Sequence, residues 1–245
     1  MVLRRPSGLV LLAAAALAAG AGAAAAAPAR DAVLGRSVEG RPIVLTRLGD
    51  PGAERRVLVV GAVHGNEPAG RAVVRALRRG PAPAGAELWL IRDLNPDGAA
   101  AGTRQNARGV DLNRNFPHRW RAQGRPFSAN YSGRRPLSEP EARLAARLIR
   151  RLRPDVTIWY HQALALVDTS NGSDPRVARR YARLAGLPAK PVGLGFLPGI
   201  ATRWQNRTQP GTSAFVVELP GGPLGAASAR RHARAVRAVA ARPPG

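Results

Sequence analysis

The sequence predicts an α/β fold with one domain, in which helices flank a mixed, mostly parallel sheet. Short apolar runs typical of buried strands alternate along the chain with segments of helical periodicity. Three polar side chains, His64, His161 and Glu218, fall at or near the ends of three of these runs. Ligands of open α/β sheets bind beyond the carboxyl ends of the strands, so the three side chains are expected to share one site.

The first half of the chain is predicted to be rich in strands. Apolar and β-branched runs bounded by turn residues indicate strands, and apolar residues three and four apart indicate a helix, which Gly80-Pro81 ends. The predicted elements are a hairpin over residues 33–50, a strand over 57–62, a helix over 67–79, a strand over 87–91 and a turn over 95–98.

The second half begins with a long polar loop over residues 104–116, and ordered loops of this length are usually functional. Ser138 and Glu141 have the spacing of a capping box, which predicts a helix that begins there and ends before Pro154. The remaining elements are a strand over residues 156–160 that ends at His161, a helix over 174–184, a strand over 215–219 and a basic helix over 224–241.

Residues 1–29 have the pattern of a secretory signal peptide. Two arginines precede an apolar run rich in alanine, and Ala27-Pro28-Ala29 fits the small-x-small cleavage pattern, which would leave Arg30 as the first mature residue. The alternative is an uncleaved anchor, but the run is poor in large apolar residues, which favours cleavage. We expect an exported protein, secreted or held in the cell envelope, whose folded domain covers residues 30–245 and has no further membrane span.

The composition excludes some classes of site and disfavours others. Without cysteine, the chain has no disulfides and no thiolate metal site. The net charge of +23 comes almost entirely from arginine. A nucleic-acid binder is disfavoured, because the arginines are spread over every segment and aromatic residues make up only 4% of the chain. We expect instead an electrostatic attraction to an anionic cell envelope or an acidic substrate.

His64 and Glu67 lie three residues apart in a turn between a predicted strand and a predicted helix. Catalytic zinc commonly takes two histidines and one glutamate and keeps a fourth position for water. His161 is the candidate third ligand; the alternatives are a core histidine bonded to the backbone and, for the pair, an ordinary surface turn. The other two histidines, His118 and His232, are expected to be solvent-exposed.

Several motifs over residues 33–220 together resemble those of the zinc carboxypeptidase family. They are His64-x-x-Glu67 with His161 far downstream, Gly35-x-Ser37-x-Glu39-Gly40-Arg41, Asn95-Pro96-Asp97-Gly98, Gly109-Val110-Asp111-x-Asn113-Arg114-Asn115, Ser138-Glu139-Pro140-Glu141 and Phe215-Val216-Val217-Glu218-Leu219. Within the family the sequence is most similar to small bacterial murein peptide amidases and carboxypeptidases, which trim cell-wall peptides. The resemblance implies the family's single-domain catalytic fold.

The resemblance also implies a metal centre. One Zn²⁺ would be held by His64, Glu67 and His161, with water as the fourth ligand. Asp111 would accept the second ring N–H of a ligand histidine and so fix the orientation of that ring.

Other residues of the motifs are implied to act on the substrate. Glu218 would be the general base that takes a proton from the attacking water and passes it to the leaving amine. Arg104 would stabilise the oxyanion, with Arg108 as an alternative in the same loop. Asn113 and Arg114 would bind the substrate's terminal carboxylate, Arg114 as a bidentate fork.

The predicted function is that of an exported zinc metallopeptidase that hydrolyses an amide bond next to a free carboxylate, in cell-wall peptides. The alternative is a zinc deacylase of the succinylglutamate desuccinylase and aspartoacylase type, which residues 64–67 and 111–114 also resemble. A third possibility is a non-catalytic cationic envelope binder. One departure from the family is that residues 199–207 lack the mobile tyrosine of larger members, and Trp204 is a candidate to shape the pocket instead.

Overall fold

The computed structural model describes residues 29–172, 174–192 and 197–241. Residues 1–28 of the predicted signal peptide lie outside the described residues. Within the described ranges, no helix has both the length and the hydropathy that crossing a membrane requires.

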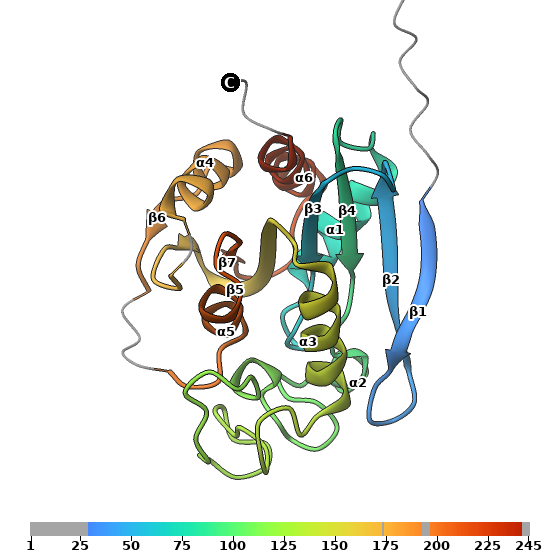
Figure 1. The fold of residues 1–245 in the computed structure, drawn as a ribbon. Coiled ribbons are helices and arrows are strands. Elements are labelled where there is room, and N and C mark those ends of the chain that lie inside the picture. The colour runs from blue at the N-terminus through green and yellow to red at the C-terminus, as the bar shows by residue number, and fades with distance from the viewer. Residues whose placement is uncertain (1–28, 173, 193–196, 242–245) are drawn as a thin grey trace, which may run out of the picture.

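One mixed sheet organises the domain (Figure 1). Its strands are β1 (Arg30–Arg36), β2 (Pro42–Gly49), β3 (Arg55–Val60), β4 (Ala86–Ile91), β5 (Val156–Asp168), β6 (Ala189–Lys190) and β7 (Ser213–Pro220). The strand order is β1-β2-β4-β3-β5-β6, and β7 pairs with β5. The hairpin β1–β2 and the pair β2–β4 are antiparallel, whereas β3 is parallel to both β4 and β5, and β5 is parallel to β6 and β7. The predicted mixed, mostly parallel sheet is therefore confirmed.

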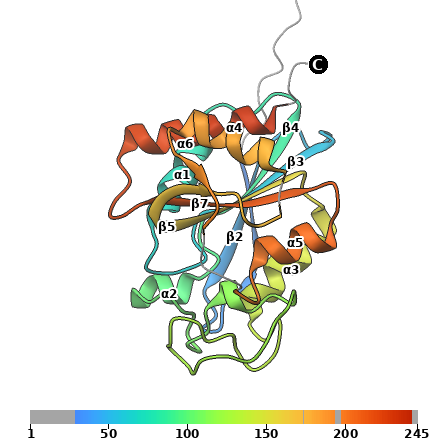
Figure 2. The same cartoon turned by 90° about the vertical axis from the view of Figure 1, so that its left-hand side faces the viewer.

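Helices cover both faces of this sheet (Figure 2). The first face carries α1 (Ala69–Arg79), α4 (Pro175–Ala185) and α6 (Ala226–Ala240), and the second carries α3 (Pro140–Leu152) and α5 (Ala201–Thr208). The sheet thus separates two apolar cores. One core contains Leu77 and Tyr181 from the first layer, and the other contains Ile149 and Trp204 from the second.

The start of α3 differs from the prediction, because the expected capping box is not formed. Glu139 is the N-cap residue, no side chain caps the helix, and the Ser138 hydroxyl donates to Glu139 at 2.7 Å. The fully buried carboxylate of Glu141 instead accepts from the backbone N–H of Val38 at 3.0 Å and from the side chain of Asn106 at 3.2 Å. A buried carboxylate needs several donors, and these long-range partners supply more than a local cap does.

β5 is longer than predicted and places His161 inside the strand. It continues from the expected end at Tyr160 to Asp168, because β7 pairs with it along its whole length. His161 lies opposite Glu218 in this pairing, and Asp168 lies opposite Val216. The extension therefore brings the end of β5 back beside the strand that carries Glu218.

Two α-helices occur in described segments where the sequence predicts none. The short helix α2 (Pro96–Ala101) replaces the turn predicted over residues 95–98, and the side chain of Asn95 caps it by accepting from the backbone N–H of Gly98 at 2.9 Å. Helix α5 forms in the segment before β7. The long loop between α2 and α3 lies beyond the carboxyl end of β4, as Figure 1 shows, and contains the short 3₁₀-helix η1 (Leu112–Arg114).

A chain of hydrogen bonds crosses the core between β5, α4 and α6. The hydroxyl groups of Tyr160 and Tyr181 lie 2.7 Å apart, and the Tyr181 hydroxyl lies 2.7 Å from Nδ1 of His232. His232 is only 3% exposed, so the prediction of a solvent-exposed side chain is wrong. His118, also expected to be exposed, is half-buried. Burial, together with the adjacent Arg231, lowers the pKa of His232 to about 4.

We expect the free energy of unfolding to fall as the pH drops from about 6.5 to about 4, with His232 contributing part of the fall. In this window the unfolded chain binds a proton that the folded protein excludes, so acid favours unfolding. The shift in pKa corresponds to on the order of 3 kcal/mol. Urea unfolding at a series of pH values, in the presence of a chelator, should show a weaker pH dependence for His232→Gln than for the wild type. If the free energy of unfolding depends on pH equally in His232→Gln and in the wild type, His232 does not contribute to the fall.

Candidate metal centre

The three predicted metal ligands come from neighbouring parts of the sheet. His64 and Glu67 lie in the turn between β3 and α1, and His161 lies in β5, which pairs with β3. The turn packs closely against α2, because a Cβ atom on Gly65 would lie only 1.9 Å from the carbonyl carbon of Gly98. Glycine is therefore required at position 65 for the turn to present its two side chains to β5.

The donor atoms of these three residues form a compact triangle. Nδ1 of His64 lies 2.9 Å from Oε2 of Glu67, Nδ1 of His161 lies 3.0 Å from the same oxygen, and the two nitrogens are 3.1 Å apart. Zinc bonds to nitrogen and oxygen are about 2.0–2.2 Å long, so one ion can reach all three atoms from a position beside the triangle. All three side chains are buried, and the donor set of two imidazoles and one carboxylate fits Zn²⁺.

Asp111 lies behind His64, on the side away from the triangle. Its Oδ1 accepts from Nε2 of His64 at 3.0 Å, which leaves Nδ1 of His64 free to bind a metal. Arg104 donates through Nε to the other oxygen of Asp111 at 3.1 Å and through Nη1 to Oε1 of Glu67 at 2.6 Å. Arg108, the alternative for this position, is exposed and lies 3.7 Å from Glu139. The structure therefore places Arg104, and not Arg108, at the metal centre.

Hydrogen bonds and nearby positive charges keep both carboxylates of this network ionised. Burial by itself would raise the pKa of Glu67, but hydrogen bonds from His161 and His64 outweigh it and hold the pKa far below the ordinary range. Burial also opposes ionisation of Asp111, and there the charge of His64, its hydrogen bond and the nearby charge of Arg104 lower the pKa strongly. A divalent metal requires ionised carboxylates, and on binding it takes the place of the protons on the imidazole nitrogens that it contacts.

Asn113 and Arg114 lie in η1, beside the metal centre. The carboxylate of Asp111 caps η1 by accepting from the backbone N–H of Asn113 at 2.9 Å. The side chain of Asn113 accepts from the backbone N–H of Ala201 at 3.0 Å, and its amide nitrogen lies 3.4 Å from Nε2 of His161. Arg114 donates from Nη1 to the carbonyl of Asn113, while its buried Nε has no hydrogen-bond partner among the described residues. Burial lowers the pKa of Arg114, which shows how poorly solvated this cation is.

Glu218 faces the same space from β7. Its Oε2 is buried and has no hydrogen-bond partner among the described residues. Burial raises the pKa of Glu218, and the charge of His161 opposes that rise. Glu218, Arg114, Arg104 and the two ligands Glu67 and His161 all line one small cavity of about 100 Å³. The fold thus collects the predicted site residues around one space, where a carboxylate oxygen and a guanidinium nitrogen have no hydrogen-bond partner within the described part of the chain.

The structure does not support a pocket role for Trp204. This side chain is 2% exposed and packs against Phe116 in the core, with the ring centroids 5.4 Å apart. Sequence reasoning also missed Gln162 and Asp168, which line the cavity from the extended part of β5. Gln162 accepts from the backbone N–H of Ala69 at 2.9 Å and so ties β5 to α1. The only feature of the sequence that could have indicated Gln162 is its position next to His161. No local pattern indicates Asp168.

Comparisons of the sequence point to one family. The profile of the family described as zinc carboxypeptidase matches residues 24–79 and 84–185. Murein peptide amidase A of Vibrio campbellii is 32% identical over 200 residues, which are 76% of this chain and 77% of that protein. Murein peptide amidase A of Escherichia coli K12 is 32% identical over 154 residues, 58% of this chain and 61% of that protein. The aligned part thus spans less than two thirds of the Escherichia coli relative.

Solved structures agree with this assignment. The crystal structure of a murein-tripeptide amidase from Escherichia coli O157 aligns with a TM-score of 0.70 and 26% identity, and the alignment covers 88% of this chain and 93% of that one. Carboxypeptidase A from Helicoverpa armigera, at 18% identity, matches in fold alone with a TM-score of 0.70. The predicted fold and the resemblance on which the ligand assignment rested are therefore confirmed.

We expect one zinc ion to bind per chain and two substitutions to weaken it to different degrees. His161→Ala removes a ligand and should abolish stoichiometric binding. Asp111→Asn keeps a hydrogen-bond acceptor but loses the charge behind His64, so the affinity should fall about 10- to 100-fold. Competition with a chromophoric chelator measures both, and Arg108→Gln, in the same loop but away from the triangle, is the matched control. Wild-type zinc affinity in His161→Ala would refute the assignment.

Proposed function

Because the chain belongs to the zinc carboxypeptidase family, we propose that it is a zinc-dependent peptidase or peptide amidase that hydrolyses an amide bond next to a free carboxylate. The observation that carries this proposal is the buried guanidinium of Arg114, whose Nε lacks a partner among the described residues, in the same cavity as the metal ligands. A buried donor without a partner is costly, and a substrate carboxylate would satisfy it.

The residues around the cavity would have different roles in catalysis. Zinc, when bound, would polarise the scissile carbonyl and lower the pKa of a water molecule. Glu218 would take the proton of the attacking water and deliver it to the leaving amine, and its raised pKa suits a group that must both accept and release a proton. Arg104 would donate to the oxyanion that develops on the scissile carbonyl, from its position against Glu67 and Asp111.

Arg114 and Asn113 would position the substrate. Arg114 presents a planar set of donors that matches the two oxygens of a carboxylate. Asn113 is fixed by the backbone N–H of Ala201, so its amide group is held at the edge of the cavity near His161. Together the two side chains would hold the terminal carboxylate at a set distance from the metal ligands, which defines the bond that is cleaved.

We propose that the natural substrate is a cell-wall peptide. The support is the similarity to proteins named murein peptide amidase A and the large positive charge, which favours anionic surroundings. The family match disfavours the deacylase alternative. The complete ligand set and Glu218 disfavour a non-catalytic binder, which would need neither.

The proposal predicts that the free carboxylate next to the scissile bond controls kcat/KM. For a γ-glutamyl-diaminopimelate peptide, amidating that carboxylate should reduce kcat/KM at least roughly ten- to a hundredfold, since each charge-assisted hydrogen bond contributes about 1.5–3 kcal/mol. Arg114→Ala should cause a similar loss on the free acid and little further loss on the amide. Arg108→Gln is the control for Arg114→Ala. A separate variant, Glu218→Gln, tests the general base and should keep zinc while losing about 10²–10⁴-fold in activity. If the wild type cleaves the peptide with the free carboxylate and the amidated peptide equally well, the proposal is wrong.

We also propose that the chain is exported, on the basis of the signal-peptide pattern of residues 1–29. Expression of the full chain in a bacterial host should yield a processed protein outside the cytoplasm, with Arg30 as its first residue. N-terminal sequencing of the fractionated protein tests this. An unprocessed chain in the membrane fraction would favour the anchor, and an unprocessed chain in the cytoplasm would contradict export.

A further inference from the structure

A second cavity, of about 620 Å³, lies within the long loop between α2 and α3, and we call it the loop cavity. Arg134 and Arg135 line it, and within the described ranges neither of them makes an ion pair. Arg108 also lines it but is paired, at 3.7 Å, with Glu139 in the same wall. Tyr131 adds an aromatic ring. The loop cavity therefore combines two available cationic groups with an aromatic ring.

The loop cavity is near the metal centre but separate from it. The backbone N–H of Asp111, the residue behind His64, donates to the carbonyl of Tyr131 at 2.9 Å. Arg104 lines the catalytic cavity and Arg108 lines the loop cavity, and four residues of chain span at most about 14 Å. The two cavities have no lining residue in common among the described residues. A ligand in the loop cavity would therefore leave the metal centre open.

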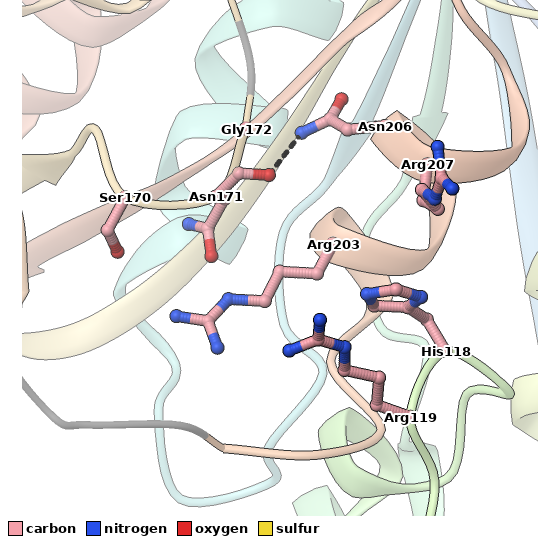
Figure 3. Close-up of a pocket in the computed structure, with 8 residues that line it drawn as sticks. All are labelled: His118, Arg119, Ser170, Asn171, Gly172, Arg203, Asn206 and Arg207. Atoms are coloured by element: carbon pink, nitrogen blue, oxygen red, sulfur yellow. Dashed lines mark hydrogen bonds between the residues drawn. The ribbon is translucent and has the colours of Figure 1, made fainter.

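Arginines alone do not distinguish the loop cavity. The cavity of about 540 Å³ in Figure 3, between the loop after η1, the turn after β5 and α5, is lined by Arg119, Arg203 and Arg207. It shares Asn171 with the catalytic cavity and therefore adjoins the metal centre. The described residues that line it include no phenylalanine, tyrosine or tryptophan. The loop cavity differs because its arginines lie beside aromatic rings.

The second of these rings, that of Phe127, lies at the edge of the loop cavity and follows Pro126 in its wall. Phe127 is 60% exposed and is the only aromatic residue in the described ranges that is classed as exposed. Its φ of +65° lies in the left-handed region, which is unfavourable for a bulky side chain. Strained backbone of this kind persists where the surrounding structure enforces it, and it is concentrated at functional sites.

Hydrogen bonds hold Phe127 in this conformation. Its backbone N–H donates to the carbonyl of Gly109 at 2.9 Å, and its carbonyl accepts from the side chain of Gln105 at 3.3 Å. A Cβ atom on Gly109 would lie only 2.4 Å from the nitrogen of Phe127, so the contact requires glycine. Gly109 lies between Arg108 and Val110, which both line the loop cavity. The exposed ring is thus fixed beside the cavity.

We propose that the loop cavity binds an acidic glycan, a chain of sugar rings that carries carboxylates. The C–H face of a sugar ring is apolar, and an exposed aromatic ring such as that of Phe127 offers a flat apolar surface on which it can pack. The guanidinium groups of Arg134 and Arg135 match the carboxylates of the glycan. The inference rests on the proposed function only for its biological role, which is to hold an exported hydrolase on an acidic polysaccharide near its peptide substrate.

The acidic group in the wall favours a glycan over a nucleic acid. Glu139 is buried and accepts from the Ser138 hydroxyl at 2.7 Å and from the side chain of Asn106 at 2.9 Å. The two oxygens of a carboxylate have lone pairs for further donors, which the hydroxyl groups of a sugar supply. The phosphates of a nucleic acid are acceptors only, and the negative charge of Glu139 repels them.

The test measures the binding of three probes that contain no peptide bond to the zinc-loaded protein. They are hyaluronan hexasaccharide, which carries carboxylates on alternate rings, chitohexaose, which has as many rings and no charge, and a hexathymidylate strand. The salt concentration is about 0.15 M, which screens long-range attraction to the cationic surface. The wild type should bind the hyaluronan hexasaccharide at least about tenfold more tightly than chitohexaose, because only the former forms charge-assisted pairs.

Two variants separate the contributions of charge and ring. Arg134→Gln/Arg135→Gln should remove most of the preference for the acidic glycan. Phe127→Asn removes the ring at a position whose left-handed backbone asparagine tolerates, and it should weaken the binding of both glycans about two- to tenfold. The matched control is Arg121→Gln/Arg147→Gln, which removes two exposed arginines that do not line the loop cavity and should retain the preference.

Equal affinity of the wild type for the two glycans would overturn the proposal, and so would a preference that survives the substitution of Arg134 and Arg135. Unchanged affinities in Phe127→Asn would overturn it as well. Hexathymidylate should lose no more affinity in either variant than in the control, and a larger loss would identify a nucleic-acid site instead. Failure of the protein to hydrolyse any peptide would reject the proposed function but would not alter these binding outcomes.

Discussion

The site depends on charges that are buried together and neutralise one another. Glu67 and Asp111 are ionised carboxylates below the surface, and Arg104 bridges them with one hydrogen bond to each. The charges of Glu67, Asp111 and Arg104 sum to −1, and a divalent metal bound by the triangle would change this sum to +1. Removing one member of such a network leaves another buried charge unpaired, and that is far more costly than losing a surface ion pair. The ligand geometry is therefore held by electrostatics as much as by packing.

Close backbone contacts bring the charged groups to one place. The turn that carries His64 can approach α2 only because Gly65 has no side chain, and η1 packs equally closely against Gly199. A Cβ atom on Gly199 would lie 2.1 Å from the carbonyl oxygen of Arg114, and the positive φ of +70° also favours glycine there. The turn that carries two of the metal ligands is thus positioned against α2, and the residue proposed to hold the substrate is positioned against the segment before α5.

Much of the fold and of the site was accessible from the sequence, because local patterns coincide with the tertiary structure there. The apolar strands, the helices α1 and α4 and the HxxE turn all satisfy their own local preferences. The failures have tertiary causes. The carboxylate of Glu141 accepts hydrogen bonds from Val38 and Asn106 and therefore does not cap its own helix. Strand β5 extends to Asp168 because β7 pairs with it. His232 belongs to a basic helix whose sequence does not show which face meets the sheet.

Arginine shows most clearly why position carries information that composition does not. Many arginines in this chain make solvated pairs, such as Arg78 with Asp31, and pairs of this kind contribute little. Arg104 differs because its partners are buried carboxylates. Arg114 differs because it is itself buried and its Nε has no partner in the ranges that the structure describes. A net charge of +23 predicts attraction to anions in general, whereas these two environments show which guanidinium groups line the cavity that also contains the metal ligands. In the proposed function, selectivity for a substrate with a free carboxylate therefore comes from Arg114 and not from the exposed arginines.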